Sequence, residues 1–144
     1  VRTSDTEEID CPFAPAEVAD PPRHQVLHPS SGHRHITKDI STGQIIMDVA
    51  DDRGEIHLYS TDLVYGSTNS QRYSITDNDP LSAKVEYQAG FTFRRGDWDV
   101  RTESNLTVTC DETQFFLVGS ITAYEDKTRV YTRDWDIKVP RTIY

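Results

Sequence analysis

Histidine and aspartate side chains gather in one strand-like segment near the start of the chain, in a pattern that could bind a metal ion. His33 and His35 lie two positions apart, so in a strand both side chains point to the same side. With Asp39 they would supply the nitrogen and oxygen ligands that transition metals take. No further ligand closes the set, and a solvated edge strand explains the same residues. We therefore predict no metal site here.

A second group of oxygen ligands, Asp77, Asn78 and Asp79, has the chemistry of a calcium loop. An EF-hand loop needs Gly at its sixth position and Glu at its twelfth, and this stretch has neither. Asp and Asn are also ordinary turn formers, because their side chains bond to nearby backbone amides. With Pro80 following, these residues predict a turn.

Pairs of carboxylates two residues apart occur twice in the second half of the chain: Asp97 with Asp99, and Asp134 with Asp136. Such pairs could serve a glycosidase-type mechanism. No partner that would shift a pKa is visible, so we interpret them as solvated strand faces around Trp98 and Trp135. The sequence has no nucleophile elbow, no phosphate-binding P-loop and no dinucleotide-binding glycine motif. We predict no catalytic residue and no cofactor in this chain.

The cysteines and the charge limit the classes of protein that fit. Cys11 and Cys110 lie far apart in a chain of 144 residues, which can bury a core without a disulfide framework. This favours a reducing, cytoplasmic compartment, where the glycosylation sequon at Asn105 would stay unused. The net charge of −9 repels phosphate backbones, so nucleic acid is not an expected partner.

The sequence shows neither a membrane-spanning segment nor a signal peptide. No stretch approaches the roughly 20 consecutive apolar residues of a membrane span, so no membrane contact is expected. A signal-peptide pattern is absent, and the first residue, Val1, predicts a fragment or a processed chain.

Residues 1–30 differ from the rest of the chain in their proline content. The prolines are Pro12, Pro15, Pro21, Pro22 and Pro29. Proline lacks a backbone donor and fixes φ, so this segment cannot lie centrally in a sheet. We predict an extended arm or linker over residues 1–30 and one antiparallel β domain over residues 31–144.

Strand signals follow from Gly32 onward, and no long window shows a helical period. Short strands are predicted at 33–40, 45–50, 55–60 and 70–75, with turns between them at 41–44 and 51–54. Longer segments near 85–93, 98–110, 115–123 and 131–139 alternate apolar and polar residues, which is typical of a sheet with one wet side. The third of these is apolar on both faces, so we expect it to be the most buried.

These patterns predict an all-β fold: an antiparallel meander that forms a β-sandwich or a partial jelly roll. Trp98 and Trp135 share their faces with aliphatic residues, so we expect both to be mostly buried.

Several runs carry a family resemblance when they are taken in order. They are Arg72-Tyr73-Ser74-Ile75, Asp79-Pro80-Leu81-Ser82-Ala83, Arg95-Gly96-Asp97-Trp98, Val100-Arg101-Thr102-Glu103, Thr109-Cys110-Asp111, Ala123-Tyr124-Glu125, Arg133-Asp134-Trp135 and Val139-Pro140-Arg141. This ordered set, which covers nearly the whole chain, resembles the C-terminal segment of bacterial hydrolases of the cocaine-esterase-like (CocE/NonD) family, relatives of X-Pro dipeptidyl-peptidases. The resemblance implies a β-rich jelly-roll domain beside an α/β-hydrolase domain that holds a Ser-His-Asp triad. This chain would match only the later part of the jelly roll and none of the triad.

Three functions remain open at this point. The leading expectation is a non-catalytic accessory domain of an ester or amide hydrolase, with the α/β-hydrolase catalytic domain as its partner. The second is a stand-alone β-sandwich module that binds a small ligand or a carbohydrate through Tyr87, Trp98 or Trp135. The third is an interaction domain that self-associates into a homo-oligomer, because half of a jelly roll leaves sheet edges and an apolar face uncovered.

Overall fold

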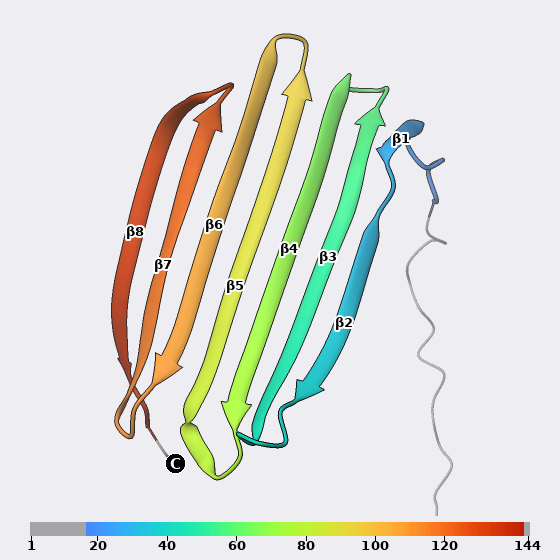
Figure 1. Ribbon diagram of the computed structural model, residues 1–144. Coiled ribbons are helices and arrows are strands. Elements are labelled where there is room, and N and C mark those ends of the chain that lie inside the picture. Colours follow the sequence, from blue (N-terminus) through green and yellow to red (C-terminus); the bar gives the residue numbers. More distant parts are fainter. Residues whose placement is uncertain (1–16, 143–144) are drawn as a thin grey trace, which may run out of the picture.

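The computed structural model describes residues 17–142, and the strands in this range form one antiparallel sheet (Figure 1). The strands are β1 (His24–His28), β2 (Ser31–Lys38), β3 (Gln44–Leu58), β4 (Leu63–Thr76), β5 (Asp79–Arg95), β6 (Trp98–Cys110), β7 (Gln114–Glu125) and β8 (Thr128–Pro140). The described residues include no helix. The prediction of an all-β antiparallel meander is therefore confirmed.

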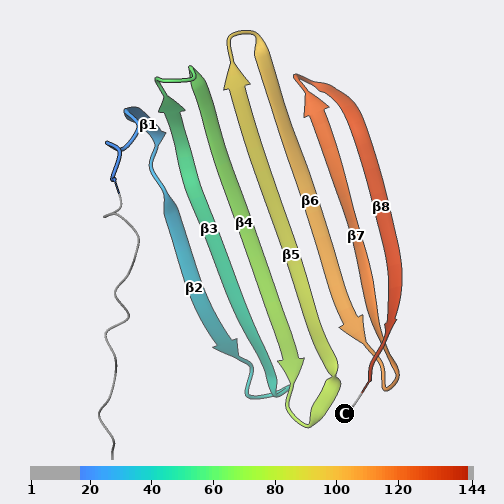
Figure 2. The ribbon, with the colours of Figure 1, turned by 180° about the vertical axis from the view of Figure 1, so that it is seen from behind.

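The order of the strands in the sheet follows the order of the chain. From β3 to β8 each strand pairs antiparallel with the next, while β1 and β2 both pair with the outer edge of β3. Figure 2 shows the same single layer from behind, with β8 at one edge and β1 and β2 at the other. The sheet is thus one strand layer thick throughout the described residues.

The edge formed by β1 and β2 depends on one glycine of β3. Gly54 has a φ of +73°, and a Cβ atom there would overlap the carbonyl oxygen of His28, where β1 ends. β1 falls inside the segment predicted as an arm, and it occupies an edge position between Pro22 and Pro29. Proline-flanked residues can join a sheet there, because an edge strand has one row of unpaired amides.

β3 corrects the prediction of two short strands separated by a turn at 51–54. The strand is continuous from residue 44 to 58, and a β-bulge lies between Asp52 and Glu55. The Asp52 carboxylate accepts a hydrogen bond from the Gly54 amide at 2.7 Å, as it would in a turn. Asp52 and Gly54 therefore form part of a β-bulge here, and the chain does not reverse its direction at this point.

Alternation along the strands separates the residues into two faces of different chemistry. The apolar face includes the in-register residues Met47, Tyr73, Val85, Val108, Leu117 and Ile137. The polar face includes the in-register residues Asp48, Arg72, Glu86, Thr107, Val118 and Asp136. Directly paired residues share a face, so these two rows define the two sides of the sheet.

Few side chains of the described residues are buried, because these residues provide no second layer over either face. Val49 and Ala89, each 9% exposed, are the buried hydrophobic residues in this range. Trp98 is 44% exposed, so the prediction that it is mostly buried is wrong, whereas Trp135 is less exposed and half-buried. β3 has two buried and two exposed residues among fifteen, whereas β7 has one buried and three exposed among twelve, so β3 and not the third long segment is the most buried strand.

Candidate functional site

The histidines considered for a metal site lie at the edge of the sheet. His33 and His35 are exposed on β2, with stacked rings whose centroids are 4.7 Å apart. Asp39 lies in the following turn, where its carboxylate accepts bonds from the Ser41 hydroxyl at 2.6 Å and the Ser41 amide at 2.8 Å. These bonds lower the pKa of Asp39. Within residues 17–142, no three His, Cys, Asp or Glu side chains are grouped so that they could hold a metal ion.

The oxygen-rich stretch between β4 and β5 forms a tight hairpin turn. Asn78 adopts a φ of +61°, which Asn tolerates better than most residues. The Asp77 carboxylate accepts a bond from Lys38 Nζ at 2.8 Å, and the Asp79 carboxylate accepts one from the Leu81 amide at 3.2 Å. The Asp77 and Asp79 carboxylates thus bond to different residues of the protein.

The paired carboxylates are exposed in the structure. Asp97 lies in the β5–β6 turn and Asp99 follows at the start of β6, while Asp134 and Asp136 project from the edge strand β8. No polar or charged side chain in the described range is buried. The described residues therefore lack the buried setting that commonly prepares a catalytic acid or base.

The aromatic residues considered for ligand binding are divided between two parts of the apolar face. Tyr87 and Trp135 belong to one in-register row, in which Leu106 and Gly119 lie between them. Trp98 lies at the far end of β6, opposite Arg95. The structure thus brings two of these aromatics onto one row and leaves the third apart.

The apolar face itself is the largest candidate site. Large hydrophobic side chains stay exposed on it, among them Ile36 (74%), Phe91 (46%) and Ile137 (45%). Two shallow hollows mark it. One of about 320 Å³ is lined chiefly by Ile45, Met47, Tyr73, Ile75 and Val85, and one of about 440 Å³ chiefly by Ile56, Tyr65, Phe91 and Phe93. Contiguous exposed apolar surface of this kind marks sites of protein interaction.

A polar row crosses the apolar face between these two hollows. Asp51, Asn69, Ala89 and Ser104 are in register across β3 to β6. The Asn69 side-chain oxygen is shielded from solvent and has no hydrogen-bond partner among the described residues. The sequence analysis did not single out this row, because it appears only once the strands are paired in register.

Basic side chains lie near both edges of the apolar face. Arg34 of β2 pairs in register with Val49, and Arg133 of β8 pairs with Ile121. The Arg133 guanidinium also lies 5.2 Å from the centre of the Trp135 ring. A surface that covers this face therefore meets apolar side chains in the middle and positive charge at both edges.

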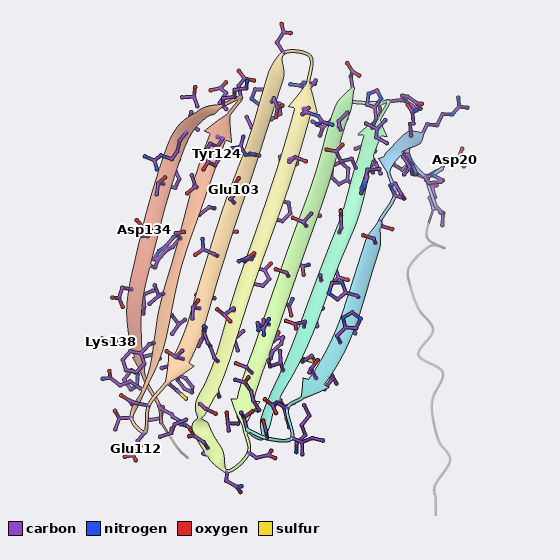
Figure 3. The ribbon with its side chains drawn as sticks, viewed as in Figure 1. Asp20, Glu103, Glu112, Tyr124, Asp134 and Lys138 are labelled. Atoms are coloured by element: carbon purple, nitrogen blue, oxygen red, sulfur yellow. The ribbon has the colours of Figure 1, made fainter. Side chains whose placement is uncertain are left out.

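The polar face is a surface on which charges neutralise each other. Its ion pairs are Arg72–Asp48 at 3.5 Å, Lys84–Glu86 at 2.7 Å, Arg94–Glu55 at 2.9 Å and Arg101–Glu103 at 3.2 Å. Figure 3 shows side chains projecting from β6, β7 and β8, with labels on Glu103, Tyr124, Asp134 and Lys138. Exposed pairs of this kind contribute little to stability, and they leave the face compatible with water.

Comparison with protein-family models, with curated proteins and with solved structures finds no match to this chain. Among residues 17–142 there is also no helix with the length and apolar character needed to cross a membrane.

Proposed function

We propose that this chain is a non-catalytic accessory β domain that packs through its apolar face on an α/β-hydrolase acting on esters or amides. One observation carries the proposal: the sheet is apolar on one face, and the described residues provide no layer that covers it. A two-layer arrangement buries such a face, and one-layer sheets are rarely stable with it bare. The domain would stand beside the active-site cleft and help to form its wall.

The choice of an α/β-hydrolase as the partner rests on the resemblance to CocE/NonD hydrolases. The runs that carry this resemblance are spread over the sheet. Arg95-Gly96-Asp97-Trp98 forms the β5–β6 hairpin, Ala123-Tyr124-Glu125 ends β7, and Arg133-Asp134-Trp135 lies in β8. The catalytic triad would belong to the partner domain, on the same chain or on another.

The charge at the edges of the apolar face favours a different protein over a second copy as the natural partner. Arg34 and Arg133 give this face positive charge on both sides. A partner with carboxylates near these edges would complement it, whereas two identical faces would bring like charges into the same interface. Self-association is therefore the second candidate function, expected when the partner is absent.

The proposal includes a reducing, cytoplasmic compartment. Cys110 is a free, half-buried cysteine at the end of β6. It faces Phe115 across the strand pair, where a small apolar side chain is sufficient.

The test is to find the hydrolase that accompanies this domain in its own cells. An antibody against the chain would be used to precipitate the native protein, followed by labelling with a fluorophosphonate probe that reacts with active serine hydrolases. We expect one labelled hydrolase, either on the same polypeptide or bound to it. A precipitated chain near 16.4 kDa without any fluorophosphonate-reactive protein would contradict the proposal.

A pair of variants makes this test specific for the apolar face. Leu106 and Thr107 are neighbours on β6 with side chains on opposite faces. If the hydrolase is a separate chain, Leu106→Glu should abolish co-precipitation and Thr107→Glu should preserve it. If both are on one chain, Leu106→Glu should separate their unfolding into two transitions.

A further inference from the structure

The polar face is hollowed into a trough that the proposed docking surface does not involve. A depression of about 650 Å³ crosses β3 to β6, and its polar-face lining is Ala50, Asp52, Thr68, Ser70, Glu86, Gln88, Gly90, Glu103, Asn105 and Thr107. Two adjoining depressions, of about 460 and 580 Å³, share lining residues with it and extend it toward the bulge of β3 and toward β2. We call this continuous depression the polar trough.

Small residues keep the floor of the polar trough low. Ala50, Ser70 and Thr68 line it on β3 and β4, and Gly90 lines it on β5. A Cβ atom at Gly90 would lie 3.1 Å from Thr68 Oγ1, so a larger side chain there would fill this space. The depression is thus a consequence of residue size at these positions.

The middle of the polar trough is a row of uncharged hydrogen-bonding side chains. Ser70, Gln88 and Asn105 line it in register across β4 to β6, and Ser120 of β7 continues the row beyond the trough. Asn105 donates a hydrogen bond from Nδ2 to Ser120 Oγ at 2.9 Å. With neighbouring strands about 4.8 Å apart, this row spans about 14 Å perpendicular to the strands.

The charged residues around this row are mostly paired with each other. Glu86 and Glu103, which flank the row, already contact Lys84 at 2.7 Å and Arg101 at 3.2 Å. A ligand in the trough therefore meets amides and hydroxyls that both donate and accept, with little unpaired charge beside them. The stacked rings of His33 and His35 line the end of the trough at β2 and offer a flat surface.

We propose that the polar trough binds a neutral, polyhydroxylated ligand, such as an oligosaccharide, that lies across β3 to β6. Sugar hydroxyl groups match amides and hydroxyls because each can donate one bond and accept others. The site is on the opposite face from Tyr87, Trp98 and Trp135, so it is distinct from the aromatic site considered from the sequence. It also leaves the apolar face free for a protein partner.

The test is an amide chemical-shift titration of the full chain with neutral oligosaccharides of glucose, xylose and mannose at millimolar concentrations. We expect saturable shifts in β3 to β6 with at least one of them. The double variant Gln88→Leu, Asn105→Leu should weaken that affinity about tenfold or more, because two hydrogen bonds are lost. The control Gln114→Leu makes the same kind of change at the start of β7, outside the residues that line the trough, and should leave the affinity unchanged.

Three results would overturn this proposal. They are the absence of shifts with all three sugars, unchanged affinity in a double variant whose spectrum remains that of a folded sheet, and tighter binding of polygalacturonate than of any neutral sugar. Because none of these readouts involves a hydrolase, they test the trough separately from the proposed docking function.

Discussion

The same strands build both faces of the sheet, but only the polar face is well suited to contact with water. On the polar face, acidic and basic side chains pair with each other across and along strands. On the apolar face, side chains such as Phe91 and Ile137 stay nearly half exposed. The apolar face is therefore the one whose exposure to water is costly, because paired charges are solvated at little cost whereas exposed apolar area is not.

The magnitude of this difference explains why the apolar face is the candidate docking surface. Each 100 Å² of apolar surface that a partner covers contributes roughly 2.5 kcal/mol before the costs of association are subtracted. The loss of translational and rotational freedom on association opposes this gain by roughly 4–15 kcal/mol. An ion pair on the polar face contributes about 1 kcal/mol or less.

The largest expected effect concerns association of the isolated chain. For the chain on its own, we expect a homodimer or a higher oligomer at low micromolar concentration, measured by light scattering. Leu106→Glu places a charge in the middle of the apolar face and should weaken association by about a hundredfold or more. Thr107→Glu, on the polar face, should leave it unchanged.

A mass near 16.4 kDa that stays constant on tenfold concentration would contradict this expectation. It would mean that the chain closes its own edges and covers its own apolar face. The comparison between the faces would then lose its functional meaning.

The second prediction compares one glycine on each face. A Cβ atom at Gly119, on the apolar face, would lie 2.7 Å from the backbone oxygen of Asn105 and 3.3 Å from Leu106 Cδ1. At Gly90, on the polar face, its nearest neighbour would be the Thr68 hydroxyl at 3.1 Å, which can rotate away. We expect Gly119→Ala to destabilise by about 1–2 kcal/mol and Gly90→Ala by less than about 0.5 kcal/mol.

Urea unfolding of both variants at one protein concentration checks this prediction. Equal losses of stability would indicate that the strand spacing near Gly119 relaxes more easily than its contacts suggest. A larger loss for Gly90→Ala would place the tighter packing on the polar face.

The alternation of residues was sufficient to predict the two faces of β5 to β8, because a side-chain period of two is visible without knowing the partners of a strand. The bulge in β3 was not predictable from composition. Asp52 and Gly54 have the chemistry of a turn, and only the pairing of both flanks with β4 shows that the strand continues. β1 was missed because proline signals next to it indicate loops as well as edge strands.

Burial was predicted less well than secondary structure, and Trp98 shows why. Its neighbours along the strand are apolar on one face, a pattern that is typical of a sheet face covered by another layer. The alternation cannot say whether the covering layer belongs to the same residues or to another protein. The described residues form no layer that covers this face, and Trp98 stays 44% exposed. The polar row through Asn69 was hidden for a related reason, since it depends on the register of four strands.

A smaller effect is expected at the β6–β7 turn, which belongs to neither face. The Asp111 carboxylate accepts bonds from the amides of Thr113 and Gln114, both at 2.7 Å, and these bonds lower its pKa below the usual 3.8. A group with a lowered folded-state pKa stabilises the fold above its unfolded-state pKa, and this contribution is lost as the pH falls through the folded value. We therefore expect Asp111→Asn to reduce the loss of stability below about pH 4.

Thermal unfolding between neutral pH and acid checks this expectation, with Glu112→Gln as the matched control for the next carboxylate. The Asp111→Asn variant should show a shallower acid dependence than the control. Identical pH profiles for both variants would mean that the turn is held by its backbone bonds alone.

The last prediction is the absence of an effect on either face: the isolated chain should not hydrolyse p-nitrophenyl acetate faster than a heat-inactivated sample. Acyl transfer by a serine needs an adjacent base and donors that stabilise the oxyanion. In the described residues, His57 Nε2 lies 2.7 Å from Asp62 Oδ1, but no serine bonds to this histidine. Ser104 Oγ, on the apolar face, donates to the Ala89 carbonyl at 3.3 Å instead. Saturable turnover that disappears when one serine is replaced by alanine would show that the chain carries its own nucleophile, and the accessory role would have to be abandoned. Residual turnover that survives every serine replacement would point to a contaminating esterase and would leave the two-face interpretation intact.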